Sequence, residues 1–280
     1  MAGCTSVFLQ PDRVQYFAKR TLDTPAQDIW IAARDGSELH ALYLPAHGVR
    51  RGTILYLHGN AENLSSHIYM VNWLPADGYA VLALDYRGYG RSQGNAGIDA
   101  AHEDAESALA WLVARGASNT GPLIVLGQSL GASIGIRVVA RSPLRDHVAA
   151  VIADSAFASY RRIAREKLAA LWLSWPLQWP LSWLISDRYA PIDVIADLAP
   201  IPLLLIHGEQ DAVVDVHHAQ ALYAAAGRPK ALWLIPHCEH IGALRREAVR
   251  QRLRDYLDGI TQVPAMPYDP SIPLSRDADE

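Results

Sequence analysis

Two kinds of apolar pattern alternate along this chain. Short, unbroken apolar runs occupy residues 52–57, 79–84, 123–126, 148–153, 201–206 and 231–235. Such runs are typical of strands that are buried on both faces of a parallel sheet. Between them, apolar residues recur every three or four positions, which predicts helices over residues 64–74, 99–115, 216–226 and 241–260. Strands that alternate with helices indicate a mostly parallel, doubly wound α/β sheet with crossover helices on both faces.

The sheet is predicted to open with an antiparallel pair and to belong to one domain. Residues 27–34 and 38–44 are strand-like, and Asp35-Gly36 between them is a strong two-residue hairpin signal. A chain of this length is ordinary for a single α/β domain, which we expect over residues 27–262. The other predicted segments are an irregular arm over residues 1–26, a long insertion over residues 155–200 and a proline-rich tail over residues 263–280.

Composition narrows the classes of function. The 280 residues carry a net charge of −4 with both signs mixed along the chain, and 50% of the residues are hydrophobic. This balance indicates no nucleic-acid-binding surface, so no nucleic acid is expected as a partner. The two cysteines, Cys4 and Cys238, are too far apart in sequence to indicate a disulfide framework or a zinc site. No metal site is therefore expected.

A G-x-S-x-G motif, Gly127-Gln128-Ser129-Leu130-Gly131, directly follows one of the apolar runs. A helix rich in small residues is predicted from Leu130 onward, so Ser129 lies at a sharp turn between a strand and a helix. Such a turn holds a serine in strained backbone dihedral angles with its hydroxyl projecting, and the two glycines leave room for the crossing strand and helix. Ser129 is the candidate nucleophile, and the backbone N–H of Leu130 is a candidate oxyanion donor.

A serine nucleophile needs a base, an orienting acid and a second oxyanion donor. The run at 52–57 ends in His58-Gly59-Asn60, where the glycine lets backbone amides face inward, so the N–H of Asn60 is the candidate second donor. His58 itself is interpreted as a structural hydrogen-bonding residue. All of these groups directly follow predicted strands, and active sites of such sheets form at the carboxyl ends of the strands.

The acid and the base are expected after the last two predicted strands. Asp211 lies in the loop after the first of them and is the candidate acid, with Asp215, which is placed to cap the next helix, and Asp154 as alternatives. His240 is favoured over His237 as the base, because it lies further into the loop and is predicted to open the last helix. A histidine with its usual pKa of about 6.5 takes the serine proton near neutrality and returns it to the leaving group.

Five motifs together resemble the α/β-hydrolase superfamily, in particular its serine aminopeptidase or lysophospholipase-like branch, which has esterases and depalmitoylases among its relatives. They read HGNA, DYRGYG, GQSLG, GEQD and CEH, and begin at His58, Asp85, Gly127, Gly208 and Cys238. The resemblance covers roughly residues 28 to 260. It implies an α/β-hydrolase fold with Ser129 as nucleophile, Asp211 as acid and His240 as base, and with Asn60 and Leu130 as oxyanion donors. Relatives usually carry a glycine just before the histidine, where this chain has Glu239.

The insertion contains an uncharged stretch over residues 168–186. Its length fits a membrane span, but Pro176 and Pro180 interrupt it and both flanking strands must return to the same sheet, so a span is rejected. Four tryptophans, three or four residues apart, would share one helical face and are candidate substrate-pocket residues: Trp172, Trp175, Trp179 and Trp183. They either pack on the domain core or form an apolar helical cap over Ser129 that shapes an acyl pocket or rests on a lipid interface.

The sequence thus predicts a serine hydrolase that cleaves carboxylic ester or thioester bonds of apolar, lipid-like acyl substrates without a metal or cofactor. An aminopeptidase-like amidase and a catalytically silent binding protein are the alternatives. No partner protein is evident, and peripheral membrane contact is an open expectation. A cytoplasmic enzyme is expected from the sequence as written, because no apolar export segment precedes Cys4; if translation starts upstream, Cys4 becomes the lipidated first residue of a membrane-anchored lipoprotein.

Overall fold

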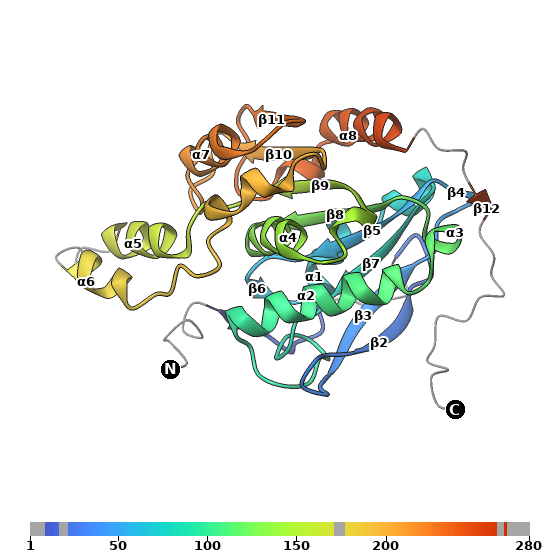
Figure 1. The fold of residues 1–280 in the computed structure, drawn as a ribbon, viewed down its shortest axis with the longest axis horizontal. Helices are drawn as coiled ribbons and strands as arrows, with labels where there is room; N and C mark the ends of the chain where they lie inside the picture. The colour runs from blue at the N-terminus through green and yellow to red at the C-terminus, as the bar shows by residue number, and fades with distance from the viewer. Residues whose placement is uncertain (1–8, 17–21, 171–176, 262–265, 268–280) are drawn as a thin grey trace.

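The computed structural model describes residues 9–16, 22–170, 177–261 and 266–267. A central sheet of eight strands runs through the molecule in the order β11-β10-β9-β8-β5-β7-β3-β2 (Figure 1). Its strands are β2 (Gln27–Ala32), β3 (Glu38–Leu44), β5 (Gly52–Leu57), β7 (Tyr79–Leu84), β8 (Leu123–Gln128), β9 (Val148–Asp154), β10 (Leu203–Gly208) and β11 (Lys230–Ile235). Each strand arises from one of the predicted strand segments, so the predicted fold class is confirmed.

Strand pairing explains why the central strands are apolar throughout. β3 pairs antiparallel with β2 and with β7, and the other neighbouring strands pair parallel. Every residue of β5, β7, β8 and β10 is buried, since helices cover both faces of the sheet there. The carboxyl ends of the parallel strands lie along one edge, and the candidate catalytic residues follow these ends.

Helices bury the two sides of the sheet against separate apolar clusters. One cluster includes α2 (Ile98–Val113), α4 (Leu130–Arg141) and α7 (His217–Ala225), and α2 and α4 cross in front of the sheet in Figure 1. The other includes α1 (Leu64–His67) and α8 (Glu247–Ile260). The short helix α3 (Ala117–Thr120) precedes β8. The two-sided covering is the doubly wound arrangement that the sequence predicts.

Two predicted helices are shorter in the structure. The segment at 64–74 forms α1 and two 3₁₀ turns, Ile68–Met70 and Leu74–Asp77, because an apolar spacing of three or four residues is satisfied by either kind of turn. The segment at 241–260 becomes helical in its α8 portion, after a 3₁₀ turn at Ala243–Arg245. Ile241 has a φ of 47°, which lies in the left-handed region, so this residue cannot be part of a right-handed α-helix. The prediction that His240 opens the last helix is therefore wrong.

The insertion carries the helices α5 (Tyr160–Ala170) and α6 (Gln178–Trp183), followed by 3₁₀ turns at Pro191–Asp193 and Ile195–Leu198. α5 and α6 pack on each other and project beyond one end of the sheet (Figure 1). Trp172 and Trp175 lie outside the described residues. In the part of the chain that the structure describes, no helix combines the length and the apolar character that crossing a membrane requires.

Both terminal segments contribute short strands. β1 (Gln10–Pro11) pairs parallel with β6 (Ala61–Glu62), directly beside Asn60. β12 (Met266–Pro267) pairs antiparallel with β4 (Val49–Arg50). The arm predicted over residues 1–26 therefore lies against the domain in its described part, and Cys4 lies outside that part.

Candidate active site

Ser129 lies on the sharp turn between β8 and α4. Its backbone has a φ of 53° and a ψ of −113°, which a non-glycine residue rarely adopts, and its N–H donates to the Asp154 carbonyl at 2.8 Å. A Cβ on Gly127 would lie 2.3 Å from the Gly131 carbonyl oxygen, and a Cβ on Gly131 would lie 2.1 Å from the Leu57 carbonyl oxygen. Only glycine fits at these two positions, so the local structure is the strained turn that the motif predicts.

Two hydrogen bonds in series connect Ser129 to a buried carboxylate. His240 Nε2 lies 3.0 Å from Ser129 Oγ, and His240 Nδ1 lies 2.7 Å from Asp211 Oδ2. Because a carboxylate oxygen only accepts, Nδ1 carries the proton, and the Nε2 lone pair of the neutral ring accepts from the Ser129 hydroxyl. This is the arrangement in which a histidine removes a serine proton during nucleophilic attack.

Asp211 is held as an anion by its surroundings. Its side chain is fully buried, and Oδ1 accepts from the backbone N–H groups of Val213 at 2.9 Å and Val214 at 2.8 Å. Burial raises the pKa of the Asp211 carboxyl, but the hydrogen bonds from His240, Val214 and Val213 outweigh it and lower the pKa below its usual value. The carboxylate is therefore ionised at neutral pH and orients the His240 ring.

The two alternative acids make other contacts. Asp215 is exposed, and its Oδ1 accepts from the backbone N–H of His217 at 2.9 Å and lies 2.8 Å from the His217 ring, at the start of α7. Asp154 is fully buried at the end of β9, where it accepts from Gln128 Nε2 at 2.8 Å and from Ser155 Oγ at 3.2 Å. Burial raises the pKa of Asp154 to about 6. Neither carboxylate has a hydrogen bond to His240 among the described residues.

The loop around the histidine accommodates Glu239 without strain. His237, the alternative base, is exposed, and its Nδ1 lies 3.2 Å from Gln210 Nε2 rather than near Ser129. The positive φ values in this loop fall on His237, at 51°, and on Ile241, at 47°, and not on Glu239. Glu239 is exposed. A glycine before the histidine is therefore not needed here to bring His240 to Ser129.

Backbone N–H groups border Ser129 from two elements. Leu130 begins α4, so its N–H is one of the first four in the helix, which have no acceptor within the helix. Asn60 follows β5 and lines the same cavity as Ser129. Its side-chain Oδ1 accepts from the Gln10 N–H and the Tyr89 hydroxyl, each at 3.1 Å, which fixes this loop in place. The two positions suit the donors of an oxyanion hole.

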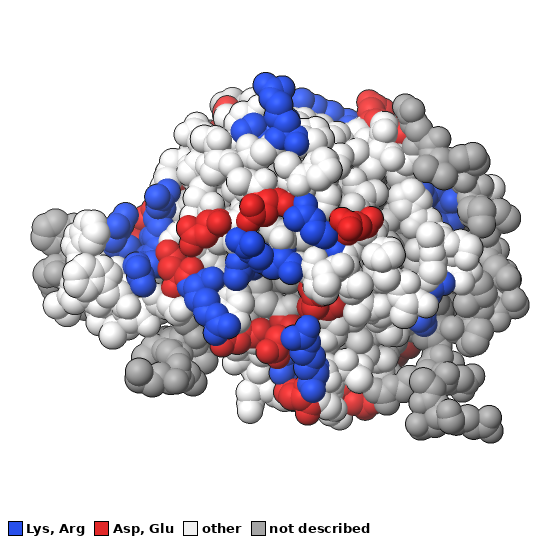
Figure 2. Space-filling model, viewed as in Figure 1, with Lys and Arg blue, Asp and Glu red and all other residues white. Residues whose placement is uncertain are grey.

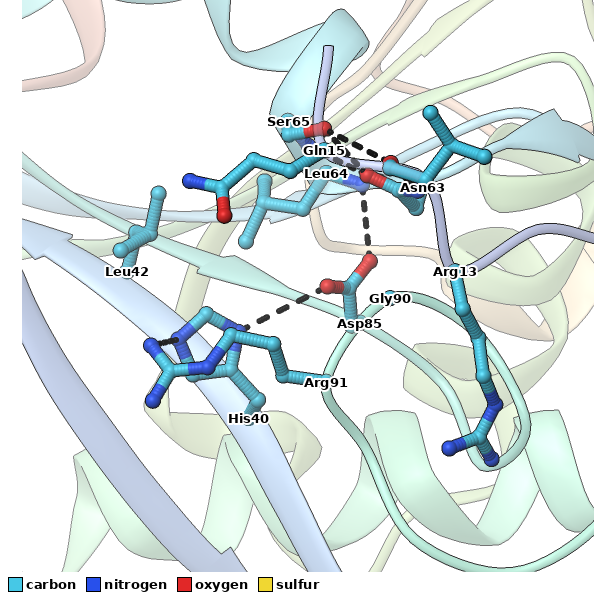
Figure 3. Close-up of a pocket in the computed structure, with 11 residues that line it drawn as sticks. Arg13, Gln15, His40, Leu42, Asn63, Leu64, Ser65, Asp85, Gly90 and Arg91 are labelled. Carbon is cyan, nitrogen blue, oxygen red and sulfur yellow. Dashed lines mark hydrogen bonds and ion pairs between the residues drawn. The ribbon is translucent and has the colours of Figure 1, made fainter. Parts of the chain in front are cut away.

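Asp85 holds the far end of the Asn60 loop, and sequence reasoning did not single it out. Its Oδ1 accepts from the Leu64 N–H at 2.7 Å and lies 3.3 Å from His58 Nε2, while Oδ2 lies 3.6 Å from His40 Nδ1, beside a small cavity of about 60 Å³ (Figure 3). Burial raises the pKa of the Asp85 carboxyl, but His40, His58 and the Leu64 N–H outweigh it and lower the pKa to about 2. The Asp85 carboxylate, which directly follows β7, thus contacts His58 at the start of the Asn60 loop and Leu64 at its end.

A cavity of about 500 Å³ opens beside Ser129 and His240. Its apolar walls come from Leu130, Phe157, Ile163, Val213, Val214 and Ile241, and its polar lining includes Gln10, Asn60, His67 and Lys167. The volume lies within the roughly 300–1,000 Å³ of small-molecule sites. A mostly apolar cavity that ends at one serine hydroxyl fits an acyl chain joined to a polar reacting group.

Comparison with known proteins places this site in a family. A family model described as serine aminopeptidase, S33, matches residues 48–197, which is more than half of the chain. This chain belongs to that α/β-hydrolase family. The motif resemblance is thereby confirmed at the level of the superfamily.

Relatives of this α/β-hydrolase support the same family. The uncharacterized protein YfhR of Escherichia coli K12 is 34% identical over 239 residues, which are 83% of this chain and 80% of that protein. The lysophosphatidylserine lipase ABHD12 of Xenopus tropicalis is 28% identical over 227 residues, which are 75% of this chain and 58% of that protein. Among solved structures, the esterase Pf2001 of Pyrococcus furiosus has a TM-score of 0.71 at 22% identity, with 92% of this chain and 97% of that chain covered, and so has the same fold.

The tryptophans of the hydrolase's insertion do not line this cavity in the part that the structure describes. Trp179 and Trp183, on α6, are 55% and 69% exposed, and neither contributes to the cavity wall. The Arg165 guanidinium lies 4.4 Å from the centre of the Trp179 ring. Trp172 and Trp175 fall outside the described residues. Trp179 and Trp183 are therefore neither core residues nor pocket-lining residues. α6 packs on α5, and both tryptophan rings stay largely exposed to solvent.

Other residues reach the site of the hydrolase from elements that local patterns do not connect to it. Gln10 lines the cavity because β1 pairs beside Asn60. Ile163 and Lys167 lie one turn apart on α5, and this i, i+4 spacing is the signal by which they could have been found. Ser155 Oγ accepts from the Ile241 N–H at 3.1 Å and so positions the residue after His240.

One cluster outside the cavity has the composition of a metal site. Ligand atoms of Glu166, His217 and His218 lie within 4.8 Å of one another. However, His218 Nδ1 accepts from the Ala158 N–H at 3.1 Å, so the proton is on Nε2, which donates to Glu166 at 2.9 Å. A metal ion would need the Nε2 lone pair, since a ligating histidine normally donates through its other nitrogen. The hydrogen bonds therefore favour a direct contact between α5 and α7 over a bound ion.

Proposed function

We propose that this α/β-hydrolase is a serine hydrolase that cleaves carboxylic ester or thioester bonds of apolar acyl substrates through an acyl-enzyme. The observation that carries the proposal is the hydrogen-bond series from Asp211 through His240 to Ser129, which ends in the mostly apolar cavity. The lipase and esterase among its relatives and structural neighbours support the same class of reaction.

The reaction follows from the protonation states of these residues. His240 Nε2 takes the hydroxyl proton as Ser129 Oγ attacks the carbonyl carbon, and the Asp211 carboxylate stabilises the imidazolium that forms. The N–H groups of Leu130 and Asn60 donate to the negative oxygen of the tetrahedral intermediate. His240 then returns its proton to the departing alcohol or thiol, which leaves the acyl group on Ser129. Water activated by the same histidine releases the acid by the reverse sequence of proton transfers.

The cavity favours an ester over the amine-bearing substrate of an aminopeptidase. A free α-ammonium group is normally recognised by a carboxylate, because a buried positive charge must be paired. No carboxylate belongs to the described lining of the cavity, whereas Lys167 contributes a cation to it. An acyl chain requires no charged partner.

Substrate profiling tests this proposal. We expect hydrolysis of p-nitrophenyl esters of graded chain length, no comparable hydrolysis of aminoacyl anilides, and loss of both turnover and fluorophosphonate labelling in Ser129→Ala. Retained labelling of Ser129→Ala would exclude Ser129 as the nucleophile. Faster cleavage of the anilides than of the esters would favour the amidase, and inertness of the folded parent protein toward both would favour a binding function.

A further inference from the structure

The most exposed apolar surface of the described chain lies on the insertion. We define the α6 face as the side chains of Leu177, Trp179, Leu181, Trp183 and Leu184, which are 37% to 69% exposed. The described residues include ten large apolar side chains with such exposure, and these five occur within eight consecutive positions. Scattered exposed apolar residues are ordinary, but a contiguous patch marks an interaction surface.

The shape of the molecule presents this face outward. α6 packs on α5, and the pair projects beyond the end of the sheet (Figure 1). Ser182, on the opposite side of α6, is buried and donates to the Trp179 carbonyl at 2.9 Å. The helix therefore has one side against the protein and an apolar side that stays largely exposed, although the Arg165 guanidinium lies over the Trp179 ring.

The segment that carries the α6 face is rich in basic residues, and one of them, Arg165, lies against the Trp179 ring at 4.4 Å from its centre. Residues 159–190 contain five basic and two acidic residues, a net charge of +3, whereas the whole chain has a net charge of −4. The basic residues are Arg161, Arg162, Arg165, Lys167 and Arg188. Figure 2 shows Lys and Arg side chains, with Asp and Glu side chains beside them, next to the uncharged projecting end at the left of the view.

Both acidic residues of this segment are engaged within the protein. Asp187 accepts from Ser159 Oγ at 2.7 Å and from the Arg161 N–H at 3.1 Å. Glu166 contacts the rings of His217 and His218. Residues 159–190 thus carry a net charge of +3, and the whole insertion over residues 155–200, which adds Asp193 and Asp197, carries a net charge of +1.

Apolar side chains that include tryptophan, bordered by basic residues, match the layered chemistry of an anionic bilayer surface. Tryptophan and leucine enter the region between headgroups and acyl chains, and Lys and Arg contact anionic headgroups. A second copy of this chain fits less well, because its equal positive charge would meet the same charge across the contact. We infer that the α6 face docks this protein peripherally on an anionic phospholipid surface.

Docking would also bring the substrate cavity to the membrane. Ile163 and Lys167, which line the cavity, belong to α5, the helix on which α6 packs. An acyl substrate held in the bilayer would therefore lie close to the wall of the cavity. This consequence depends on the proposed hydrolase function, whereas the docking itself does not.

Vesicle flotation of the full chain tests the docking. We expect binding to phosphatidylcholine vesicles that contain phosphatidylglycerol, weaker binding to phosphatidylcholine alone, and loss of binding as salt is raised. Trp179→Ala combined with Trp183→Ala should weaken binding at least about tenfold, since each ring leaves water on docking. Arg161→Glu should weaken it roughly thirtyfold, because a change of two charges near the surface corresponds to about 2 kcal/mol.

Matched variants separate docking through the α6 face from loss of apolar area, charge or catalytic activity elsewhere in the protein. Val49→Ala removes apolar area from another exposed side chain, and Arg245→Glu reverses another exposed charge, so both should bind like the parent protein. Ser129→Ala should also bind normally, which keeps a failure of catalysis distinct from a failure of docking. Melting temperature should be unchanged in the double tryptophan variant, because both rings are exposed.

Three outcomes would overturn the inference. The first is equal binding to neutral and anionic vesicles, and the second is undiminished binding by a folded double tryptophan variant. The third is dimerisation that the double variant abolishes in the absence of lipid, which would assign the α6 face to a second copy of the chain.

Discussion

Replacement of Asp211 by asparagine tests the hydrogen-bond series directly. Asparagine keeps the shape of the buried side chain, and its carbonyl oxygen is required on the Oδ1 side, where Val213 and Val214 both donate N–H groups. Its NH₂ group therefore takes the Oδ2 position and faces His240 Nδ1. That nitrogen must now accept, so the proton resides on Nε2, which can no longer take the proton of Ser129.

The expected loss is large and specific to catalysis. The wrong histidine tautomer costs about ten-thousand-fold in kcat in enzymes that use this arrangement, which corresponds to about 5.5 kcal/mol of transition-state stabilisation. The effect should appear mainly in kcat, because the Asp211 side chain does not line the cavity that would hold the acyl chain. Stability should change little, because the amide still donates to His240 and still accepts from the two backbone N–H groups.

The assay is the initial rate of hydrolysis of the best p-nitrophenyl ester, with melting temperature measured on the same samples. The matched control is Asp215→Asn, which makes the same chemical change at an exposed residue that bonds His217. A kcat of Asp211→Asn within about tenfold of the parent, a difference of only about 1.4 kcal/mol, would refute the tautomer argument. A larger loss in Asp215→Asn than in Asp211→Asn would show that the acid is misassigned.

Three further predictions concern the surroundings of the site. Gly131→Ala should destabilise the fold by about 3 kcal/mol or more, since the new Cβ would lie 2.1 Å from the Leu57 carbonyl oxygen. Gly259→Ala is the control: its new Cβ would have nothing within 4 Å, so the change should stabilise α8 by about 0.5–1 kcal/mol. Urea unfolding of both variants measures the two changes. Burial lowers the pKa of His102 to about 4, so His102 binds fewer protons in the folded state than in the unfolded chain below about pH 6.5, and its contribution to stability falls by about 3 kcal/mol as the pH drops from 7 to 4. His102→Phe keeps the ring stack on Tyr189 and should flatten that pH dependence; an unchanged slope in unfolding experiments would contradict the assignment. Asp85→Asn should lower kcat more than it changes KM if the N–H of Asn60 acts on the transition state as proposed, and a lower melting temperature with unchanged kcat would reduce Asp85 to a structural role.

Local sequence determined the order and type of the main elements. Each of the eight strands of the sheet, from β2 to β11, corresponds to a segment that its own residues predict, because burial on both faces demands an unbroken apolar run. The turn at Ser129 was equally predictable, since Gly127 and Gly131 lie within two residues of the strain that they permit. Such features depend on residues that are neighbours in the chain, so they can be predicted without knowledge of the tertiary structure.

Only the tertiary structure decided which side chains meet. Asp154, Asp211 and Asp215 all follow strands closely, and their sequence positions do not tell which carboxylate points at His240, because that depends on how separate loops turn toward one another. The left-handed backbone of Ile241, which keeps the predicted helix from beginning there, and the position of Gln10 at the cavity likewise result from contacts between distant segments.

The tryptophans of the insertion show the same limit most plainly. Their spacing predicts one apolar helical face, and in a protein such a face is normally buried. Whether it is buried depends on the presence of another surface opposite, which no local pattern specifies. In the structure α6 packs on α5, and Trp179 and Trp183 stay largely exposed although Arg165 of α5 lies over the Trp179 ring, so the tertiary arrangement turns a predicted core or pocket face into an exposed one.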